Sequence, residues 1–264
     1  MTSQTIVKME GISKAFAGIK ALDNVQIDLR QGEIHALMGE NGAGKSTLMK
    51  VLSGIHEPTK GTITINNINY NKLDHKLAAQ LGIGIIYQEL SVIDELTVLE
   101  NLYIGRHLTK KICGVNIIDW REMRVRAAMM LLRVGLKVDL DEKVANLSIS
   151  HKQMLEIAKT LMLDAKVIIM DEPTSALDPK SRRNLINMLN KFEHTKLITS
   201  HDLDMVLDTC NRIIVIKNGE IIADGSSKQI LRDSELLDTC GLEIPLSIQN
   251  CPICGRGNKQ FVNK

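Results

Sequence analysis

Short apolar runs bounded by Gly, Pro, Asn or Asp residues recur along the chain and predict the strands of a sheet. In order, the predicted strands are residues 6–10, 25–29, 33–38, 62–65, 83–87, 167–171 and 196–199, followed by a hairpin of 212–217 and 220–224. Amphipathic runs at residues 45–53, 74–81 and 203–210, and runs that begin at Pro179 and Ser227, predict helices. This alternation favours an α/β fold around a largely parallel sheet.

Helical patterns replace strands between residues 89 and 164, with helices predicted at 96–103, 119–134 and 150–163. We therefore expect a helical subdomain, about residues 89–164, inserted into one domain that covers residues 1–240. The entry to this insertion, residues 105–115, carries three basic side chains. We interpret it as a solvated surface loop, with a partner contact as the alternative.

A glycine-rich turn connects the apolar run 34–38 to the helix predicted from residue 45. It consists of Gly39, Glu40, Asn41, Gly42, Ala43, Gly44, Lys45, Ser46 and Thr47. A strand, a glycine loop and a helix start in this order direct backbone N–H groups and the helix dipole at one point, where a polyphosphate can sit. In this pattern Lys45 meets the β- and γ-phosphates and Ser46 ligates Mg²⁺. The alternative is a glycine-rich turn without a ligand, and the flanking strand and helix patterns count against it.

Polar side chains stand at the carboxyl ends of three predicted strands: Gln88 directly after the fifth, Asp171 and Glu172 at the end of the sixth, and His201 two residues after the seventh. Because the carboxyl ends of parallel strands meet at one edge of a sheet, we expect these side chains near the phosphate loop. Asp171 would hold Mg²⁺ through water, and Glu172 would polarise the attacking water. Gln88 would reach Mg²⁺ or a water, and His201 would contact the γ-phosphate. The alternatives are solvent-exposed acids at a strand end and an ordinary surface or core histidine.

Phe16 is one of three phenylalanines and lies in a polar, glycine-containing stretch instead of an apolar run. One interpretation is an adenine-stacking platform beside the phosphate loop, and the other is an ordinary core residue. The residues around Phe16 leave both open.

Composition narrows the function classes further. The chain has 264 residues, 44% of them hydrophobic, which is enough for a large core. Its 33 Lys and Arg against 31 Asp and Glu give a net charge of +2, too balanced to favour nucleic-acid or electrostatic membrane binding. The first ten residues lack the apolar core of a secretory signal, and no apolar window approaches the roughly 18 residues of a membrane span. We therefore expect a chain that stays on the cytoplasmic side.

The five cysteines are an odd number, and reduced thiols are the expectation. Residues 241–264 form a predicted tail in which Cys251 and Cys254 stand as Cys-Pro-Ile-Cys-Gly, which resembles half of a zinc knuckle. A closed zinc site needs four ligands, and only Cys210 and Cys240 could complete it within the chain. A disordered or artefactual tail, a zinc site and a redox pair remain the alternatives.

These motifs together resemble those of an ATP-binding-cassette (ABC) ATPase over about residues 4–235. The resemblance implies a P-loop NTPase fold with a mixed or parallel sheet core, an N-terminal antiparallel β subdomain and an inserted helical subdomain. It implies that Phe16 stacks on adenine, that the phosphate loop is Walker A, and that Gln88 is the Q-loop residue. It further implies that Asp171 ends Walker B, that Glu172 is the catalytic carboxylate, and that His201 is the switch histidine.

Residues 147–153, sequence LSISHKQ, stand where this family carries its signature, usually LSGGQ or, in sugar importers, LSIGQ. The resemblance implies that two cassettes face each other head to tail, with each ATP between one phosphate loop and the partner's signature. Ser148, Ser150 and the first N–H groups of the following helix would form this second anion site. Ser150 replaces a glycine of this signature. One possibility is that its Cβ weakens the phosphate contact, and the other is that its hydroxyl adds a hydrogen bond to phosphate.

Residues 33–175 are similar to the first cassette of D-allose/ribose-type sugar importer ATPases, whereas residues 176–235 look more like single-cassette cobalt/nickel or vitamin importer ATPases. A composite chain is therefore one possibility, beside a natural one. The resemblance implies an ATP- and Mg²⁺-dependent ATPase at the cytoplasmic face of the membrane, which energises uptake of a solute, with a sugar favoured.

The implied partners are transmembrane permease subunits, a second cassette in a homo- or heterodimer and, indirectly, an extracytoplasmic solute-binding protein, with no nucleic acid. Alternatives are a cobalt/nickel or vitamin importer ATPase and a hydrolysis-impaired regulatory module. A translation-factor or DNA-repair relative of the same superfamily would show a second cassette with a charged linker or a long heptad insertion, and the sequence has neither.

Overall fold

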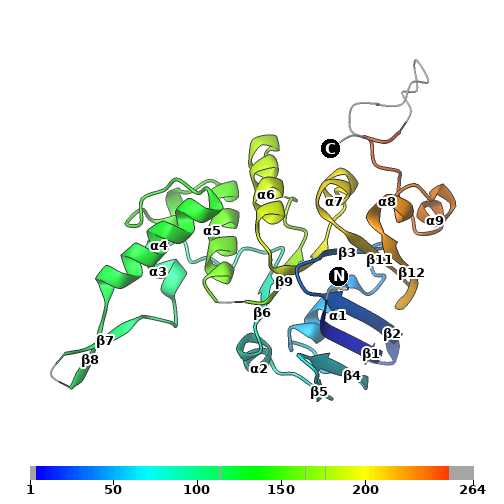
Figure 1. The fold of residues 1–264 in the computed structure, drawn as a ribbon, viewed down its shortest axis with the longest axis horizontal. Coiled ribbons are helices and arrows are strands. Elements are labelled where there is room, and N and C mark those ends of the chain that lie inside the picture. The colour runs from blue at the N-terminus through cyan, green and yellow to red at the C-terminus, as the bar shows by residue number, and fades with distance from the viewer. Residues whose placement is uncertain (1–3, 113, 164, 176, 250–264) are drawn as a thin grey trace.

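A computed structural model describes residues 4–112, 114–163, 165–175 and 177–249, which form two main sheets and a helical lobe that carries a small two-stranded sheet (Figure 1). The helices are α1 (Lys45–Leu52), α2 (His75–Gln80), α3 (Val98–Tyr103), α4 (Trp120–Val134), α5 (Ile149–Leu161), α6 (Pro179–Lys191), α7 (Leu203–Thr209), α8 (Ser227–Ile230) and α9 (Ser234–Thr239), with a 3₁₀ turn at Val144–Asn146. Asp, Ser or Thr side chains cap the amino ends of α2 to α7 and α9, which fixes where these helices begin.

The central sheet has six strands in the order β12-β11-β3-β10-β9-β6. Their bounds are β3 (Ile34–Met38), β6 (Ile83–Ile86), β9 (Val167–Asp171), β10 (Thr195–Thr199), β11 (Arg212–Lys217) and β12 (Glu220–Ser226). All neighbours run parallel except β11 and β12, which form an antiparallel hairpin. The predicted α/β fold with a largely parallel sheet is therefore confirmed.

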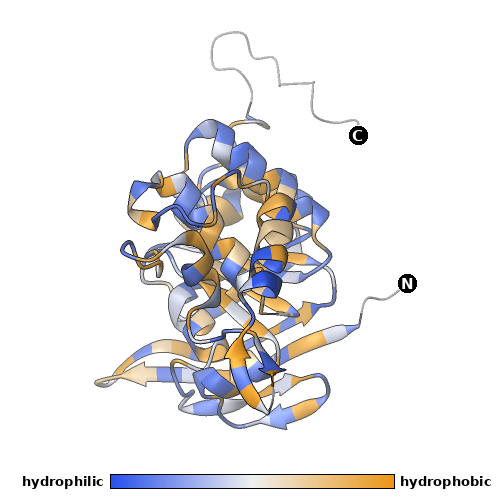
Figure 2. Cartoon of the chain, turned by 90° about the vertical axis from the view of Figure 1, so that its left-hand side faces the viewer, coloured by the Kyte–Doolittle hydropathy of each residue, from blue (hydrophilic) through white to orange (hydrophobic). Residues whose placement is uncertain are grey.

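Successive residues of the central strands face two different cores. Leu37 and Ile169 belong to the core shared with α1 and the second sheet, whereas Ala36 and Met170 belong to the core shared with α3 to α7. Because both faces are covered, these strands read as continuous apolar runs. The second sheet alternates apolar and polar residues instead, as the orange and blue segments of its lower strands show in Figure 2.

The second sheet is antiparallel, in the order β2-β1-β4-β5, with β1 (Thr5–Phe16), β2 (Ile19–Arg30), β4 (Lys60–Ile65) and β5 (Ile68–Tyr70). Strands β1 and β2 are more than twice as long as the predicted runs, because their remaining parts are polar and bulged, and bulges break the alternation that marks a strand. Strand β5 is absent from the predicted strands, because an Asn-rich stretch precedes it. Asn66 and Asn67, both with positive φ, make only the turn itself and leave β5 to pair with β4.

The prediction of a loop at residues 105–115 is wrong in part, because a hairpin of β7 (Thr109–Ile112) and β8 (Val115–Ile118) starts there and projects from the helical lobe (Figure 1). All eight strand residues are exposed, in keeping with the solvated surface that the sequence predicted. The hairpin buries no apolar face, so the sequence lacks the alternation of buried and polar positions from which strands are recognised. The lobe itself comprises α3, α4 and α5.

Candidate active site

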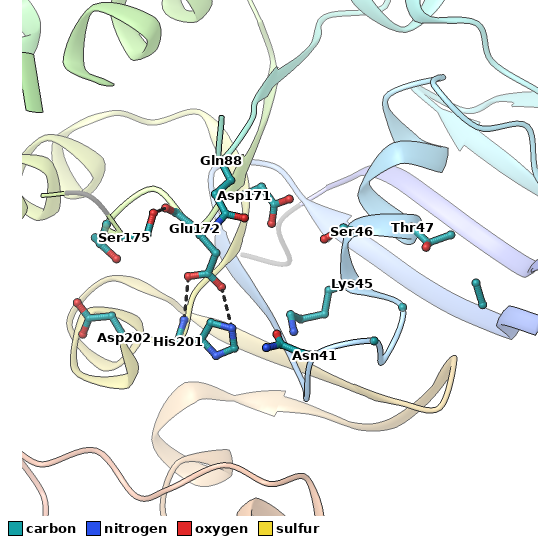
Figure 3. A pocket seen from close by; sticks show the side chains of 14 residues that line it. Asn41, Lys45, Ser46, Thr47, Gln88, Asp171, Glu172, Ser175, His201 and Asp202 are labelled. Atoms are coloured by element: carbon teal, nitrogen blue, oxygen red, sulfur yellow. Dashed lines mark hydrogen bonds and ion pairs between the residues drawn. The ribbon is translucent and has the colours of Figure 1, made fainter. Parts of the chain in front are cut away.

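A cavity of about 740 Å³ lies at the carboxyl ends of β3, β6, β9 and β10, where the sequence placed the functional side chains (Figure 3). It is lined by Ala21, Asn41, Gly42, Gly44, Lys45, Ser46, Thr47, Gln88, Asp171, Glu172, Thr174, Ser175, His201 and Asp202. The structure thus brings together the predicted phosphate loop and the predicted residues of all three strand ends.

Glycine is required in the phosphate loop because backbone approaches it closely. A Cβ on Gly39 would lie 2.1 Å from the carbonyl oxygen of Ile216, and a Cβ on Gly44 would lie 2.7 Å from that of Ala21. Both glycines have positive φ, which disfavours other residues. Gly44 is also the N-cap of α1 and offers no side-chain acceptor, so the first N–H groups of this helix are available to an anion.

Lys45 bends back over the loop, and its Nζ donates to the carbonyl oxygens of Gly39 at 2.7 Å and Glu40 at 3.0 Å. Partial burial lowers the pKa of Lys45, and the nearby carboxylates of Glu172 and Asp171 oppose that shift. Lys45 therefore lines the same cavity as the phosphate loop and the two acids. A phosphate group in this cavity would give it a stronger, charge-assisted acceptor than the two carbonyls.

Asp171 and Glu172 are held by Thr199 on the neighbouring strand. Thr199 Oγ1 donates to Asp171 Oδ1 at 2.6 Å and accepts from the Glu172 backbone N–H at 3.1 Å. The Glu172 N–H also donates to the Thr199 carbonyl oxygen at 3.2 Å. Thr199 was not among the predicted site residues, because its role depends on its pairing with Asp171 in register across β9 and β10, which no local pattern reveals.

Glu172 adopts φ of 49°, in the left-handed region where a non-glycine residue costs about 1–3 kcal/mol. Neighbouring residues hold it there: besides Thr199, Ser175 Oγ donates to the Glu172 carbonyl oxygen at 3.0 Å. This backbone turn points the carboxylate into the cavity, beside His201 (Figure 3). The contacts around Glu172 therefore hold its backbone in a conformation that it would not adopt by itself.

His201 contacts the Glu172 carboxylate twice. Its backbone N–H donates to Glu172 Oε2 at 3.1 Å, and its ring Nε2 lies 3.5 Å from Oε1. Oε1 is buried and has no hydrogen-bond partner among the described residues. A buried carboxylate oxygen without a donor is what a general base for a water molecule requires.

The same cavity offers oxygen ligands of the kind that Mg²⁺ prefers: the Ser46 hydroxyl, the Asp171 carboxylate and the Gln88 amide. Across the described residues, no group of three or more His, Cys, Asp or Glu side chains is placed to hold a metal. These residues therefore fit Mg²⁺ bound jointly by a few protein oxygens and nucleotide phosphates, and not an all-protein cage.

Some predicted site residues lie elsewhere. Phe16 does not line the cavity; its ring meets that of His56 edge-on at 5.1 Å and lies under Lys14 Nζ at 5.1 Å. Its adenine-stacking role stays a prediction. Gly39, Glu40 and Ala43 belong to the phosphate loop but do not line the cavity. The carbonyl oxygens of Gly39 and Glu40 accept hydrogen bonds from Lys45.

The signature residues also lie away from the cavity. Ser148 caps α5 by accepting from the His151 N–H at 3.3 Å, and its Oγ lies 3.0 Å from Ser150 Oγ. The buried Gln153, on the same helix, donates through Nε2 to the Pro173 carbonyl oxygen at 2.6 Å. This bond ties the signature helix to the segment that follows Glu172.

The predicted zinc ligands are not assembled in the part of the chain that the structure describes. Cys210 and Cys240 are buried free thiols. Burial raises the pKa of Cys210 to about 12 and also raises that of Cys240, so both stay protonated near neutral pH. Cys251 and Cys254 lie outside the described residues.

Within the part of the chain that the structure describes, no helix is long and apolar enough to cross a bilayer.

Known proteins match this chain along most of its length. The D-allose import ATP-binding protein AlsA of Escherichia coli (strain K12) is 70% identical over 241 residues, which cover 90% of this chain and 47% of that protein. The ribose import ATP-binding protein RbsA 2 of Burkholderia cenocepacia (strain HI2424) is 40% identical over 222 residues, 83% of this chain and 43% of that protein. The chain spans about half the length of the curated relatives it matches. The AlsA alignment extends past residue 176, so one relative matches both segments for which different resemblances were predicted.

Solved structures agree with the fold. The ADP conformation of MJ1267, an ATP-binding cassette of an ABC transporter, superposes with a TM-score of 0.79 at 31% identity, covering 89% of this chain and 98% of that one. CbiO1 of Clostridium perfringens, part of the ABC transporter complex CbiONQ, gives a TM-score of 0.72 over 89% and 94% of the two chains, at 29% identity.

The family model described as ABC transporter matches residues 22–175, from the second strand to the segment that follows Glu172. The predicted fold class is thus confirmed, as is the predicted resemblance to sugar importer ATPases. The chain belongs to the family of ABC transporter ATP-binding domains.

Proposed function

We propose that this chain binds Mg-ATP and hydrolyses it, as the energy-supplying part of an ABC importer whose solute is a sugar. The observation that carries the proposal is the convergence of Lys45, Ser46, Gln88, Asp171 and Glu172 on one cavity with His201. The relatives support the sugar class, since their names refer to import of D-allose and ribose. They do not favour a cobalt/nickel or vitamin importer.

Binding begins at the phosphate loop. The free N–H groups of α1 and the Lys45 ammonium provide donors for the β- and γ-phosphates. The hydroxyl of Ser46, the carboxylate of Asp171 and the amide of Gln88 would hold Mg²⁺, which neutralises charge on the phosphates when bound.

Glu172 acts on the attacking water. Its unpartnered Oε1 accepts a hydrogen bond from the water and draws the water proton, while Oε2 stays fixed by the His201 N–H. Thr199 keeps both carboxylates in position, because it contacts Asp171 and the Glu172 backbone at once. The His201 ring lies beside Glu172, where it can contact the γ-phosphate.

The signature half of the site comes from a second cassette in this proposal, because Ser148 and Ser150 do not line this chain's own cavity. Ser148 caps α5, so the amino end of this 13-residue helix presents a positive dipole to an anion brought by a partner. Two cassettes would then close around ATP and separate after hydrolysis. That movement would drive transmembrane permease subunits at the cytoplasmic face, fed by a solute-binding protein outside.

Steady-state phosphate release tests the proposal. We expect Mg-ATP turnover in the purified chain, and we expect Glu172→Gln to lower it at least about 100-fold with little change in ATP affinity. Glu57→Gln, which alters an exposed glutamate outside the cavity, is the matched control and should leave turnover unchanged. Turnover that survives Glu172→Gln would refute the assigned role, and ATP binding without turnover in the unmodified chain would favour a regulatory module. Stimulation of turnover by a co-purified permease and a hexose or pentose tests the sugar class.

A further inference from the structure

A second cavity, of about 650 Å³, lies at the opposite edge of the central sheet from the ATP cavity. It is formed where β9 and β10 begin, next to the carboxyl ends of α4 and α6. Its lining includes Lys166, just before β9, and Thr195, the first residue of β10. No residue of the phosphate loop or of the strand ends that carry Asp171 and His201 contributes to it.

Positive charge dominates this second cavity. Its lining has three cationic side chains: Arg133 of α4, Lys191 of α6, and Lys166, which precedes β9. The one carboxylate in the lining is that of Glu193. Among the described residues, none of these three cations makes an ion pair within 4.0 Å. The Arg133 guanidinium is instead placed over the Phe192 ring, 4.6 Å from its centre, which leaves its N–H donors for another partner.

A buried cation lies behind the lining. Lys196, only 1% exposed, donates from Nζ to the carbonyl oxygen of Phe192 and, at 3.0 Å, to that of His194. With Arg133, Lys166 and Lys191 it brings the count to four cations. Glu193 offsets about one charge, and the carboxyl ends of α4 and α6 offset roughly half a charge each. About two positive charges remain, which matches a dianion.

The lining also includes an imidazole ring. The ring of His194 lines the cavity, and its Nδ1 is buried without a hydrogen-bond partner among the described residues. Burial, together with Lys196 and Arg133, lowers the pKa of His194, so the ring is neutral and can donate from one nitrogen. The amide side chains of Gln4, Gln31 and Asn66 add neutral donors and acceptors at the rim.

We propose that this cavity binds a small phosphate-bearing anion, separately from ATP. Its volume falls within the range of small-molecule sites. Unpaired Arg and Lys side chains recognise phosphate oxygens, and the rim amides suit the hydroxyl groups of a phosphate ester. A doubly charged phosphate satisfies the excess positive charge better than a monocarboxylate does.

Histidine NMR can test this proposal in the full chain. Lys45→Ala is used as the background, because it removes the main cation of the ATP cavity and so weakens phosphate binding there. The probes are inorganic phosphate and glucose 6-phosphate, each compared with KCl at equal ionic strength. The His194 ring resonances, assigned by their loss in His194→Gln, report binding at the cavity itself. We expect a saturable shift of these resonances with phosphate and none with KCl.

Variants then locate the binding. Lys166→Gln combined with Lys191→Gln removes two exposed cations and should weaken the apparent affinity at least about tenfold. Lys110→Gln combined with Lys111→Gln, on the exposed strand β7, is the matched control and should change nothing. Equal affinity for both probes would identify the phosphate group alone as the ligand, and tighter glucose 6-phosphate binding would assign the rim amides to an ester. A shift that does not saturate, or an affinity that ignores the loss of Lys166 and Lys191, would overturn the proposal.

Discussion

Thr199→Val removes the hydroxyl that joins the two acids of the proposed active site. Thr199 Oγ1 donates to Asp171 at 2.6 Å and accepts from the Glu172 N–H at 3.1 Å. Valine keeps the branched shape but cannot form either bond. The Glu172 N–H retains the Thr199 carbonyl oxygen at 3.2 Å, so the backbone turn persists while the Asp171 carboxylate loses its donor.

The size of the effect follows from the bond that is lost. A hydrogen bond to a charged group contributes about 1.5–3 kcal/mol. Each 1.36 kcal/mol of transition-state stabilisation corresponds to a factor of about ten in rate. If the Thr199 bond acts through the position of Asp171 and Glu172, kcat for ATP hydrolysis should fall about 10- to 100-fold. KM for ATP should change less than about twofold, because the phosphate loop is untouched.

The assay is steady-state phosphate release over a range of Mg-ATP concentrations, with thermal unfolding measured in parallel. Thr199→Ser restores the hydroxyl and should recover most of the lost kcat, whereas a purely structural role would move the melting temperature and leave kcat intact. An unchanged kcat in Thr199→Val, or an equal loss in Thr199→Ser, would show that the Thr199 hydroxyl does not position the two acids for hydrolysis.

Three further predictions concern the signature, a buried lysine and an ion-pair network. Ser150→Gly should raise steady-state ATPase activity, because the side chain of Ser150 hinders close approach of phosphate to the backbone; an unchanged or lower rate would contradict this. Burial lowers the pKa of Lys196 from 10.5 to about 8, so above about pH 8 the folded state releases a proton that the unfolded state keeps. Between about pH 8 and pH 9, the free energy of unfolding of the wild type should therefore rise by on the order of 1 kcal/mol relative to that of Lys196→Met. If urea denaturation gives the same difference between the two proteins at both pH values, the prediction is wrong. Arg212 donates to Asp28 and Asp224, so Arg212→Met, which leaves Asp224 without its cation and Asp28 with Arg30 alone, should cost about 1.5–3 kcal/mol of unfolding free energy by urea denaturation. A loss below about 1 kcal/mol would show that water replaces the guanidinium.

The sequence could predict the site where local pattern and topology agree. The phosphate loop is contiguous, and the rule that parallel strands end at one edge was enough to gather Gln88, Asp171, Glu172 and His201. Thr199 could not be found in this way, because its partner is 28 residues away and depends on strand register. The strained backbone of Glu172 likewise results from tertiary contacts and leaves no mark in the sequence.

The strands that the sequence did not predict are those without a buried face. The exposed hairpin of β7 and β8 and the short strand β5 have no alternation of buried positions. Lys196 shows the opposite case, since a charged residue in an apolar strand turns out fully buried, with its ammonium bonded to two backbone carbonyls. Burial of such a residue depends on the acceptors that the fold supplies.

The oligomeric state of Glu172→Gln, measured by size-exclusion chromatography with light scattering, tests the proposed closure of two cassettes around ATP. We expect a monomer without nucleotide or with ADP, and a stable dimer with saturating Mg-ATP, because binding is kept while hydrolysis is blocked. Adding Ser148→Arg to this variant should abolish the dimer, since Ser148 caps the helix that would meet the partner's phosphate in the proposed dimer. A Glu172→Gln chain that binds Mg-ATP but stays monomeric would contradict closure of two copies around ATP.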